Sequence, residues 1–345
     1  PYHSTTTTLL DCTNEWYANM DRGLYNLVVF LDLKKSFDTV NHEILLSKLQ
    51  IYGFDSNAIN LMRSYLSNRI QTCQLTNVYS GEREVIRGIP QGSILGPLLF
   101  LIYINDLPNC LKCTTPRMFA DDTNLTAFGE TLEEVRERAA IDVGNVRKWL
   151  CANKLSLNIE KTEYVLIGSR YKMQHSDTQL RLESGNQNIK NVKNTKVLGV
   201  QLDENLNWVK HIDYISSKVS SGIGALKRLR EFVDQSTLVK VYNALIQPYF
   251  DYCCEVWDCL NEGLSDRLQK LQNRAARLIM NLKNEHGQSV IARQSLGLIT
   301  LKERRSQMKA KLMYKTVNGL APQRLCEIFK NSNEIHNYNL RGSLT

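Results

Sequence analysis

The stretch Phe119-Ala120-Asp121-Asp122 decides how the rest of the chain is interpreted. Runs rich in threonine and apolar residues flank it on both sides, so the pattern predicts a strand, a tight turn and a second strand. Two adjacent carboxylates in a dry pocket repel each other, and one pKa rises unless a cation compensates them. A divalent metal ion is one such cation. Solvated turn residues are the alternative, since Asp is a favoured turn former.

The length and composition indicate a soluble globular protein. The chain has 345 residues, enough for two domains, with 43% hydrophobic and 23% charged residues. No stretch approaches the ~18 consecutive apolar residues of a membrane-spanning helix, and no signal peptide opens the chain. We therefore expect an intracellular protein with no membrane partner.

The nine cysteines are scattered and odd in number, which disfavours a secreted disulfide scaffold. Cys110 and Cys113 form one CxxC pair, but the sequence has no second pair and no His at zinc spacing. Reduced thiols are therefore favoured over a structural zinc site.

The net charge of +8 is unevenly distributed along the chain. Residues 1–206 carry a net charge of −1, whereas residues 207–345 carry +9. The C-terminal part is therefore the candidate for contact with a polyanion. A solvated basic face is the alternative.

Hydrophobic periodicity changes near Leu206, with mixed elements before it and helices after it. A short apolar, β-branched run over 26–31 predicts a strand buried on both faces. Before the boundary we expect helices over 9–20, 44–53, 55–66, 97–104 and 130–151, and strands over 68–76, 81–87, 157–167 and 195–202. After it we expect helices over 211–232, 236–246, 264–282 and 301–314.

Asp32 stands at the carboxyl end of the predicted buried strand, where ligand-binding groups of α/β layers tend to emerge. If this strand lies beside the hairpin tip, Asp32, Asp121 and Asp122 converge. Such oxygen donors suit Mg²⁺. Two ions ~3.5–4 Å apart would stabilise the attacking and leaving oxygens of an in-line phosphoryl displacement.

Several motifs occur in the order and approximate spacing of those of reverse transcriptases. Motifs A, B and C resemble residues 31–38 (LDLKKSFD), 88–97 (GIPQGSILGP) and 119–122 (FADD). Motif D resembles Leu157-Asn158 with Lys161-Thr162-Glu163, and motif E resembles 197–200 with 206–208 and His211. The whole chain thus resembles the reverse transcriptase of a non-LTR (LINE-type) retrotransposon, most similar to the jockey-like branch.

The resemblance implies catalytic roles for four side chains. Asp32 and Asp121 would be the principal metal ligands, helped by the backbone carbonyl of Leu33, and Asp122 would be the second carboxylate of the turn. The implied cofactor is a pair of Mg²⁺ ions, with Mn²⁺ as a substitute. Lys161 would be the general acid that protonates the pyrophosphate leaving group; an exposed strand-edge lysine is the alternative.

The resemblance also implies positions that contact the nucleotide and the primer. Phe37 would be the steric gate that excludes a ribose 2′-hydroxyl, with core packing as its alternative role. Gln91 and Gly92 would contact the incoming nucleotide and the template, and Gly allows a base pair to approach closely. Leu198 and Gly199 would form the primer grip, a hairpin that positions the 3′-hydroxyl.

The implied fold class is α+β: a right-hand polymerase palm with partial fingers over 1–206, followed by a mostly helical thumb/connection region over 207–345. The thumb would track the duplex backbone through basic residues of its first helix, which are Lys218, Lys227, Arg228 and Arg230. Asp38 is expected to cap the helix after motif A, and Asp106 receives no chemical role.

The implied function is RNA-directed DNA polymerisation during target-primed reverse transcription. Its partners would be an RNA template, a DNA primer or target DNA, and dNTPs, in the nucleus after a cytoplasmic ribonucleoprotein stage. Residues 1–8 and 337–342 resemble segments that continue in complete members, so we expect a chain truncated at both ends of a polyprotein with an upstream endonuclease domain. Two alternatives remain: an inactive fragment that binds RNA or primer–template duplex, and a two-metal phosphohydrolase.

Overall fold

The computed structural model describes residues 2–174, 180–185 and 187–328, which form two compact units. The sheet unit comprises Asn19–Lys193, and the helical unit comprises the described parts of Pro1–Ala18 and Asn194–Thr345. The sequence predicts a domain boundary after residue 206, whereas the two units divide after Lys193, 13 residues earlier. The helical unit also includes an N-terminal segment that the sequence assigns to the first domain. The assignment of polymerase domains to these units stays a prediction.

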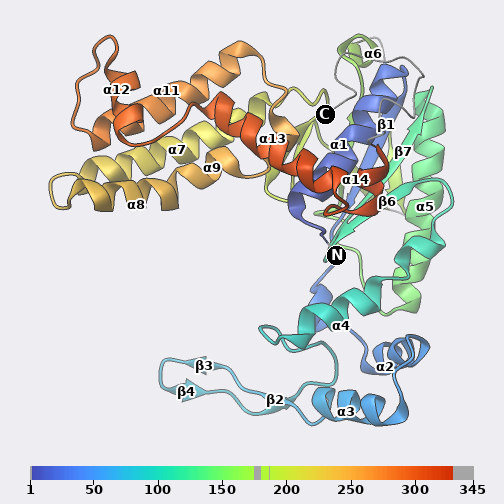
Figure 1. The fold of residues 1–345 in the computed structure, drawn as a ribbon. Coiled ribbons are helices and arrows are strands. Elements are labelled where there is room, and N and C mark those ends of the chain that lie inside the picture. The colour runs from blue at the N-terminus through green and yellow to red at the C-terminus, as the bar shows by residue number, and fades with distance from the viewer. Residues whose placement is uncertain (1, 175–179, 186, 329–345) are drawn as a thin grey trace. The chain divides into compact units, whose positions relative to one another are not determined.

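A six-stranded sheet forms the centre of the sheet unit (Figure 1). Its strand order is β6-β7-β1-β8-β10-β9, and every pair is antiparallel except β8 with β10. The strands are β1 (Tyr25–Leu31), β6 (Thr115–Phe119), β7 (Asp122–Gly129), β8 (Glu163–Ile167), β9 (Leu182–Ser184) and β10 (Gln187–Asn191). The strand predicted over 26–31 is therefore confirmed as β1, which lies between β7 and β8 and is almost entirely buried.

Helices complete the sheet unit. These are α2 (His42–Ile51), α3 (Ser56–Leu66), α4 (Leu95–Ile104), α5 (Leu132–Ala152) and α6 (Arg170–Gln174), with 3-10 turns η1 (Ser36–Asp38) and η2 (Leu107–Cys110). The longest, α5, begins where the Thr131 side chain accepts a hydrogen bond from the backbone N–H of Glu134. Its buried residues recur every three or four positions, including Val135, Ala139 and Val143, as expected for a helix packed by one face.

Between α3 and α4 the chain forms two short two-stranded ribbons (Figure 1). They pair β2 (Ile70–Gln71) with β5 (Arg83–Glu84), and β3 (Gln74–Leu75) with β4 (Val78–Tyr79). All eight residues are exposed. The strands predicted over 68–76 and 81–87 are thus present as fragments.

The helical unit contains a β-hairpin and a set of packed helices. The elements are α1 (Thr5–Asp21, within this unit up to Ala18), β11 (Asn194–Val197), β12 (Val200–Asp203), α7 (Val209–Leu229), α8 (Gln235–Leu245), α9 (Gln247–Asp251), α10 (Cys254–Trp257), α11 (Glu262–Ile279), α12 (Gln288–Ser295), α13 (Leu301–Val317) and α14 (Gln323–Ile328). Large aromatic side chains fill its core: Trp16, Trp208 and Trp257 are fully buried. Helices dominate after residue 206, as the periodicity predicts.

A buried ion pair ties the last long helix to the core of the helical unit. Arg305 of α13 donates to Asp258 and to Ser265 Oγ, the latter at 2.8 Å, and its guanidinium lies 5.9 Å from the centre of the Trp257 ring. The neighbouring Arg304 forms a two-point pair with Asp251 at 2.5 and 2.6 Å. Paired in this way, the two arginines can be withdrawn from water without leaving an isolated charge.

Three local expectations were wrong. Asp38 does not cap the helix after motif A, because Asn41 is the residue whose side chain accepts from the backbone N–H of Ile44. The strand predicted over 157–167 begins only at Glu163, and Leu157 forms an isolated bridge instead. The strand predicted over 195–202 is the hairpin β11–β12.

All nine cysteines are free thiols, of which Cys12, Cys253 and Cys254 are buried, and the CxxC pair is half-buried. None of the described helices is long and apolar enough to span a membrane.

Candidate active site

The register of β1 against β7 brings two of the predicted carboxylates to one edge of the sheet. Leu31, the last residue of β1, pairs with Thr123 of β7. Continuing this antiparallel register by one residue sets Asp32 opposite Asp122. The central strand thus delivers motif A directly to the start of β7.

The third carboxylate lies in the turn of the β6–β7 hairpin. Phe119 pairs with Asp122, which leaves Ala120 and Asp121 as a two-residue loop. Ala120 adopts φ of +55°, a left-handed conformation that tight hairpin turns require and that costs a non-glycine residue roughly 1–2 kcal/mol. The predicted strand, turn and strand are present, with Asp121 in the turn and Asp122 at the first position of β7.

The three carboxylates act on one another electrostatically. The pKa of the Asp122 carboxyl is raised by partial removal from water and by the negative charges of Asp121 and Asp32. A cation bound among the three would reverse this effect.

Hydrogen bonds from neighbouring segments hold two of these acids. Asn158 donates from Nδ2 to Oδ2 of Asp32 at 2.8 Å, and the backbone N–H of Asp32 donates to Thr162 Oγ1 at 3.3 Å. The buried Ser36 donates to Oδ2 of Asp121 at 3.4 Å. The segments that resemble motifs A, C and D therefore meet at this edge of the sheet.

The residues fit a divalent cation by chemistry, although they do not form a closed cage. Among the described residues, no group of three or more His, Cys, Asp or Glu side chains is arranged to hold a metal ion. One oxygen of Asp32 and one of Asp121 accept hydrogen bonds from neutral side chains. Oxygen donors of this kind match Mg²⁺, which keeps several waters and takes one or two carboxylates.

Phe37 packs on the motif B helix. Its ring stacks on Phe100 of α4, with 4.6 Å between centroids and 20° between planes. The backbone N–H of Ile89 donates to the carbonyl of Phe37 at 2.9 Å. Phe37 is half-buried and packs against the core of the sheet unit.

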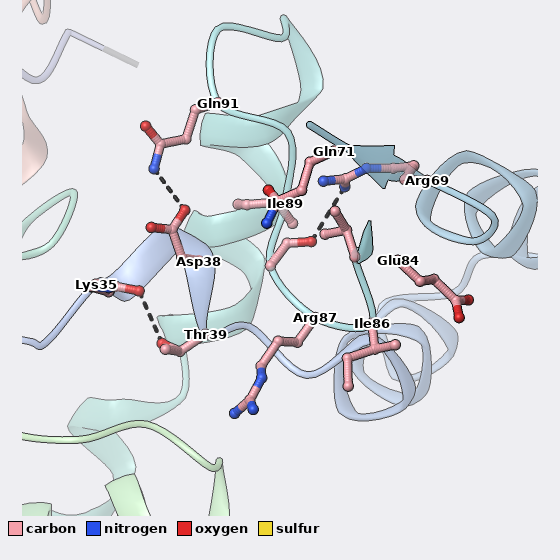
Figure 2. Close-up of a pocket in the computed structure, with 12 residues that line it drawn as sticks. Lys35, Asp38, Thr39, Arg69, Gln71, Glu84, Ile86, Arg87, Ile89 and Gln91 are labelled. Carbon is pink, nitrogen blue, oxygen red and sulfur yellow. Dashed lines mark hydrogen bonds between the residues drawn. The ribbon is translucent and has the colours of Figure 1, made fainter. Parts of the chain in front are cut away.

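A pocket of about 620 Å³ separates the η1 turn from the base of the exposed ribbon (Figure 2). On one wall Gln91 donates from Nε2 to Oδ1 of Asp38 at 2.7 Å. On another, Arg69 donates to the carbonyl of Gly88 at 3.4 Å. Arg69 and Arg87 line this pocket, and sequence reasoning missed both because scattered arginines in a polar segment carry no motif.

The two glycines of motif B, Gly88 and Gly92, have different surroundings. Gly88 has φ of +85°, and a Cβ there would lie 2.7 Å from the carbonyl oxygen of Asp38. Gly92 has φ of +79° but faces open space. Backbone conformation requires glycine at both positions, and only Gly92 leaves room for a ligand.

The remaining predicted site residues lie in turns. Lys161 is exposed in the turn that precedes β8, and its backbone N–H donates to the carbonyl of Asn158 at 3.2 Å. Leu198 and Gly199 form the two-residue loop of β11–β12, with φ of +44° and +84°. Tyr252 donates to the carbonyl of Leu198 at 2.7 Å. This loop belongs to the helical unit, whereas the carboxylates belong to the sheet unit.

The chain belongs to the reverse transcriptase (RNA-dependent DNA polymerase) family, whose pattern it matches over residues 2–202. It is 26% identical over 258 residues to a probable RNA-directed DNA polymerase from transposon X-element of Drosophila melanogaster, covering 73% of this chain and 28% of the relative. It is 27% identical over 288 residues to the corresponding protein of transposon BS of the same species, covering 80% and 31%. The resemblance to non-LTR, LINE-type reverse transcriptases is confirmed.

Two further matches are weaker than these. The RNA-directed DNA polymerase from mobile element jockey of Drosophila melanogaster is 22% identical over 287 residues, covering 80% of this chain and 31% of that relative. The match to the structure of apo telomerase from Candida Tropicalis covers 79% of this chain and 45% of the telomerase chain, at 11% identity. Its TM-score of 0.46 is too low to establish a common fold. The chain thus spans about three-tenths of the curated relatives named here.

Proposed function

We propose that this protein is an RNA-directed DNA polymerase that adds deoxynucleotides to a primer 3′-hydroxyl during target-primed reverse transcription. The observation that carries the proposal is the grouping of Asp32, Asp121 and Asp122 at one edge of the sheet, where partial burial and the charges of Asp121 and Asp32 raise the pKa of Asp122. Membership of the reverse transcriptase family supports it.

Asp32 and Asp121 would hold two Mg²⁺ ions, for which Mn²⁺ would substitute, with the carbonyl of Leu33 and the carboxylate of Asp122 as further ligands. The ions would stabilise the attacking and leaving oxygens of an in-line displacement. Asn158 and Ser36 would fix the orientations of Asp32 and Asp121, to which they are hydrogen-bonded. This chain's contribution is thus to keep carboxylates in place around a developing charge.

The primer 3′-oxygen would attack the α-phosphorus of the nucleotide, the bond to pyrophosphate would break, and the hydroxyl proton would pass to solvent. Lys161 would donate a proton to the departing pyrophosphate oxygen. Lys161 is exposed, has a long and flexible side chain, and lies in the same turn as Asn158, which allows this role. An ordinary solvated lysine is the alternative.

Selection of the nucleotide would fall to motifs A and B. The ring of Phe37, which is fixed by its stacking on Phe100, would block a 2′-hydroxyl. Gln91 and Gly92 would contact the nucleotide and template from the loop before α4. The loop of Leu198 and Gly199 would grip the primer.

The wider context is also proposed. The chain would act on an RNA template with a DNA primer or target DNA and dNTPs, in the nucleus after a cytoplasmic ribonucleoprotein stage. Because it spans about three-tenths of its named relatives, the complete protein would include further domains, among them an upstream endonuclease.

Primer extension on an RNA template with Mg²⁺ and dNTPs tests the proposal. The wild type should extend the primer, whereas Asp121→Asn should not, while both bind duplex equally well. Asp21→Asn is a matched control, since Asp21 is an exposed carboxylate at the end of α1. Equal extension by the wild type and Asp121→Asn would overturn the mechanism.

An inactive fragment that only binds RNA or primer–template duplex is not favoured. All three carboxylates are retained, and their surroundings position them. A two-metal phosphohydrolase is weaker still, because Asn158, Thr162 and Ser36, the side chains hydrogen-bonded to Asp32 and Asp121 in the described part of the chain, include no base that would activate water.

A further inference from the structure

A side chain of motif B is hydrogen-bonded to a side chain of motif A. Gln91 donates from Nε2 to Oδ1 of Asp38 at 2.7 Å, and both residues line the pocket beside the η1 turn (Figure 2). Within the described part of the chain, neither side chain forms any other hydrogen bond or ion pair. The cap of α2 is Asn41, so the Asp38 carboxylate is left to hold Gln91.

The turn that carries Asp38 is bonded to motif B on both sides. The backbone N–H of Ile89 donates to the carbonyl of Phe37, one residue before Asp38, at 2.9 Å. The backbone N–H of Gly88 donates to the carbonyl of Val40, two residues after Asp38, at 2.8 Å. A Cβ at Gly88 would lie 2.7 Å from the carbonyl oxygen of Asp38. The main chain of Asp38 is therefore fixed relative to motif B, and its short side chain stays within reach of Gln91.

The loop that carries Gln91 is fixed in its main chain, whereas the Gln91 side chain depends on Asp38. Ser93 donates from Oγ to the carbonyl of Pro90 at 2.7 Å and accepts from the backbone N–H of Gly96 at 2.9 Å. The side chain of Gln91 is exposed, and a long exposed side chain samples several rotamers when nothing holds it. The bond to Asp38 selects one arrangement.

The carboxylate of Asp38 also decides which end of the Gln91 amide is presented. An ionised carboxylate only accepts hydrogen bonds, so the amide must turn its nitrogen to Asp38. Figure 2 shows the nitrogen of Gln91 on the side of Asp38 and the oxygen on the other side. A bond with one charged partner is roughly twice as strong as a neutral one. Asp38 therefore sets both the position of the amide and its polarity, and leaves Oε1 as an acceptor for a ligand.

We propose that Asp38 is a positioning residue that presets the amide of Gln91 for the incoming nucleotide. The inference rests on the proposed polymerase function and on the nucleotide contact proposed for Gln91. Asp38 would act through Gln91, whose Oε1 would accept a hydrogen bond from the nucleotide. A group that is already in its bound arrangement loses less conformational entropy when the ligand arrives. Asp38 would thus tighten nucleotide binding and take no part in the chemical step.

Steady-state incorporation of one dNTP on an RNA template with Mg²⁺ tests the inference through kcat and KM. Asp38→Ala should raise KM roughly tenfold, the scale of one hydrogen bond to a charged group, with little change in kcat. Gln91→Ala should raise KM at least as much, and Asp38→Ala/Gln91→Ala should raise it no further, because one residue acts through the other. Asp38→Asn retains an oxygen that accepts from Nε2 and should stay close to the wild type.

A reversal of the bond gives a second test that a merely structural role would not pass. Gln91→Glu sets two carboxylates against each other and should raise KM more than Gln91→Ala. Adding Asp38→Asn supplies an amide nitrogen that donates to the new carboxylate, so Asp38→Asn/Gln91→Glu should recover most of the loss. Glu84→Gln is the matched control, because Glu84 is an exposed carboxylate that lines the same pocket without bonding to Gln91. Its KM should equal that of the wild type.

Independent, additive effects of Asp38→Ala and Gln91→Ala on KM would overturn the inference. Failure of Asp38→Asn to recover Gln91→Glu, or a rise in KM for Glu84→Gln equal to that for Asp38→Ala, would overturn it as well. Thermal unfolding checks that each variant is folded. Failure of the polymerase proposal would appear differently, as absent extension by the wild type itself, whereas failure of this inference leaves the wild type active.

Discussion

Asn158 is hydrogen-bonded to Asp32 at two points. Its side-chain Nδ2 donates to Oδ2 of Asp32 at 2.8 Å, and its backbone N–H donates to the carbonyl oxygen of Asp32 at 2.8 Å. In the opposite direction, the backbone N–H of Lys34 donates to the carbonyl oxygen of Ser156 at 2.8 Å, so the two segments run side by side. Motif D thereby fixes both the main chain and the carboxylate of the motif A aspartate.

Replacing Asn158 by Ala should leave the fold intact and reduce catalysis. The carboxylate of Asp32 would lose its side-chain donor, and loss of such an orienting partner typically costs 10–100-fold in metal affinity or activity. Primer extension over a Mg²⁺ titration measures the change, and Mn²⁺ electron paramagnetic resonance reports binding separately. If the dependence of the rate on Mg²⁺ concentration is unaltered, Asn158 holds the backbone in place but does not orient the Asp32 carboxylate for metal binding.

Replacing Phe37 by Val should relax selection against ribonucleotides. The ring that would exclude a 2′-hydroxyl is removed, and Phe100 loses its stacking partner at 4.6 Å. We expect incorporation of ribonucleotides to rise at least about tenfold relative to deoxynucleotides. Single-nucleotide incorporation with matched dNTP and rNTP measures the ratio, and a ratio equal to that of the wild type would leave Phe37 as a core residue only.

Replacing Asp142 by Ala should destabilise the sheet unit. Asp142 is fully buried on α5 and accepts hydrogen bonds from the backbone N–H groups of Lys112, Cys113 and Thr114. These three donors fix the segment that leads into β6 and would be left unpaired, at about 1–3 kcal/mol for each buried group that finds no water. Denaturant unfolding measures the loss; a change below about 0.5 kcal/mol would contradict it.

The same carboxyl predicts sensitivity to acid. Burial would raise the pKa of Asp142, but the hydrogen bonds from Cys113, Lys112, Thr114 and Asn145 outweigh it, and the pKa lies below its ordinary value. Its stabilisation is therefore fully present above the unfolded pKa of ~3.9 and is lost as pH falls below it. In Asp142→Asn, the free energy of unfolding should fall less steeply below about pH 4 than in the wild type.

His211 should make the helical unit less stable in mildly acidic solution. Burial lowers the pKa of His211 to about 4, from an ordinary value of 6.5. Since the folded state favours the neutral ring, the stabilisation is present above pH 6.5 and falls as the pH drops from 6.5 to about 4. His211→Gln should flatten the stability profile over that interval, and an unchanged slope would rule His211 out as its cause.

The sequence predicted the strand β1 and the β6–β7 hairpin that carry these acids, because that information is local. A β-branched run gives β1, two acids between strand-forming residues give the hairpin tip, and the motif order brings Asp32 to them. Prediction from the sequence failed where more than one side chain could take the same structural role. Both Asp38 and Asn41 can cap a helix, and the fold assigns the cap to Asn41 while Gln91 binds Asp38.

Contacts between distant segments were beyond the reach of sequence patterns. The stacking of Phe37 on Phe100 and the position of Lys196 over Tyr214 join residues with no shared period or motif. The hairpin of β11 and β12 was implied by family resemblance, whereas its apolar pattern alone predicts one strand. Its turn at Leu198 and Gly199 interrupts a run that reads as continuous.

The most direct test of the central claim is the single-turnover rate of adding one dNTP to a primer on an RNA template with Mg²⁺, measured beside duplex affinity. For Asp32→Asn and Asp121→Asn we predict a loss of at least about 100-fold in rate with duplex affinity unchanged, and wild-type behaviour for Asp21→Asn. Wild-type rates in Asp32→Asn and Asp121→Asn would contradict the account.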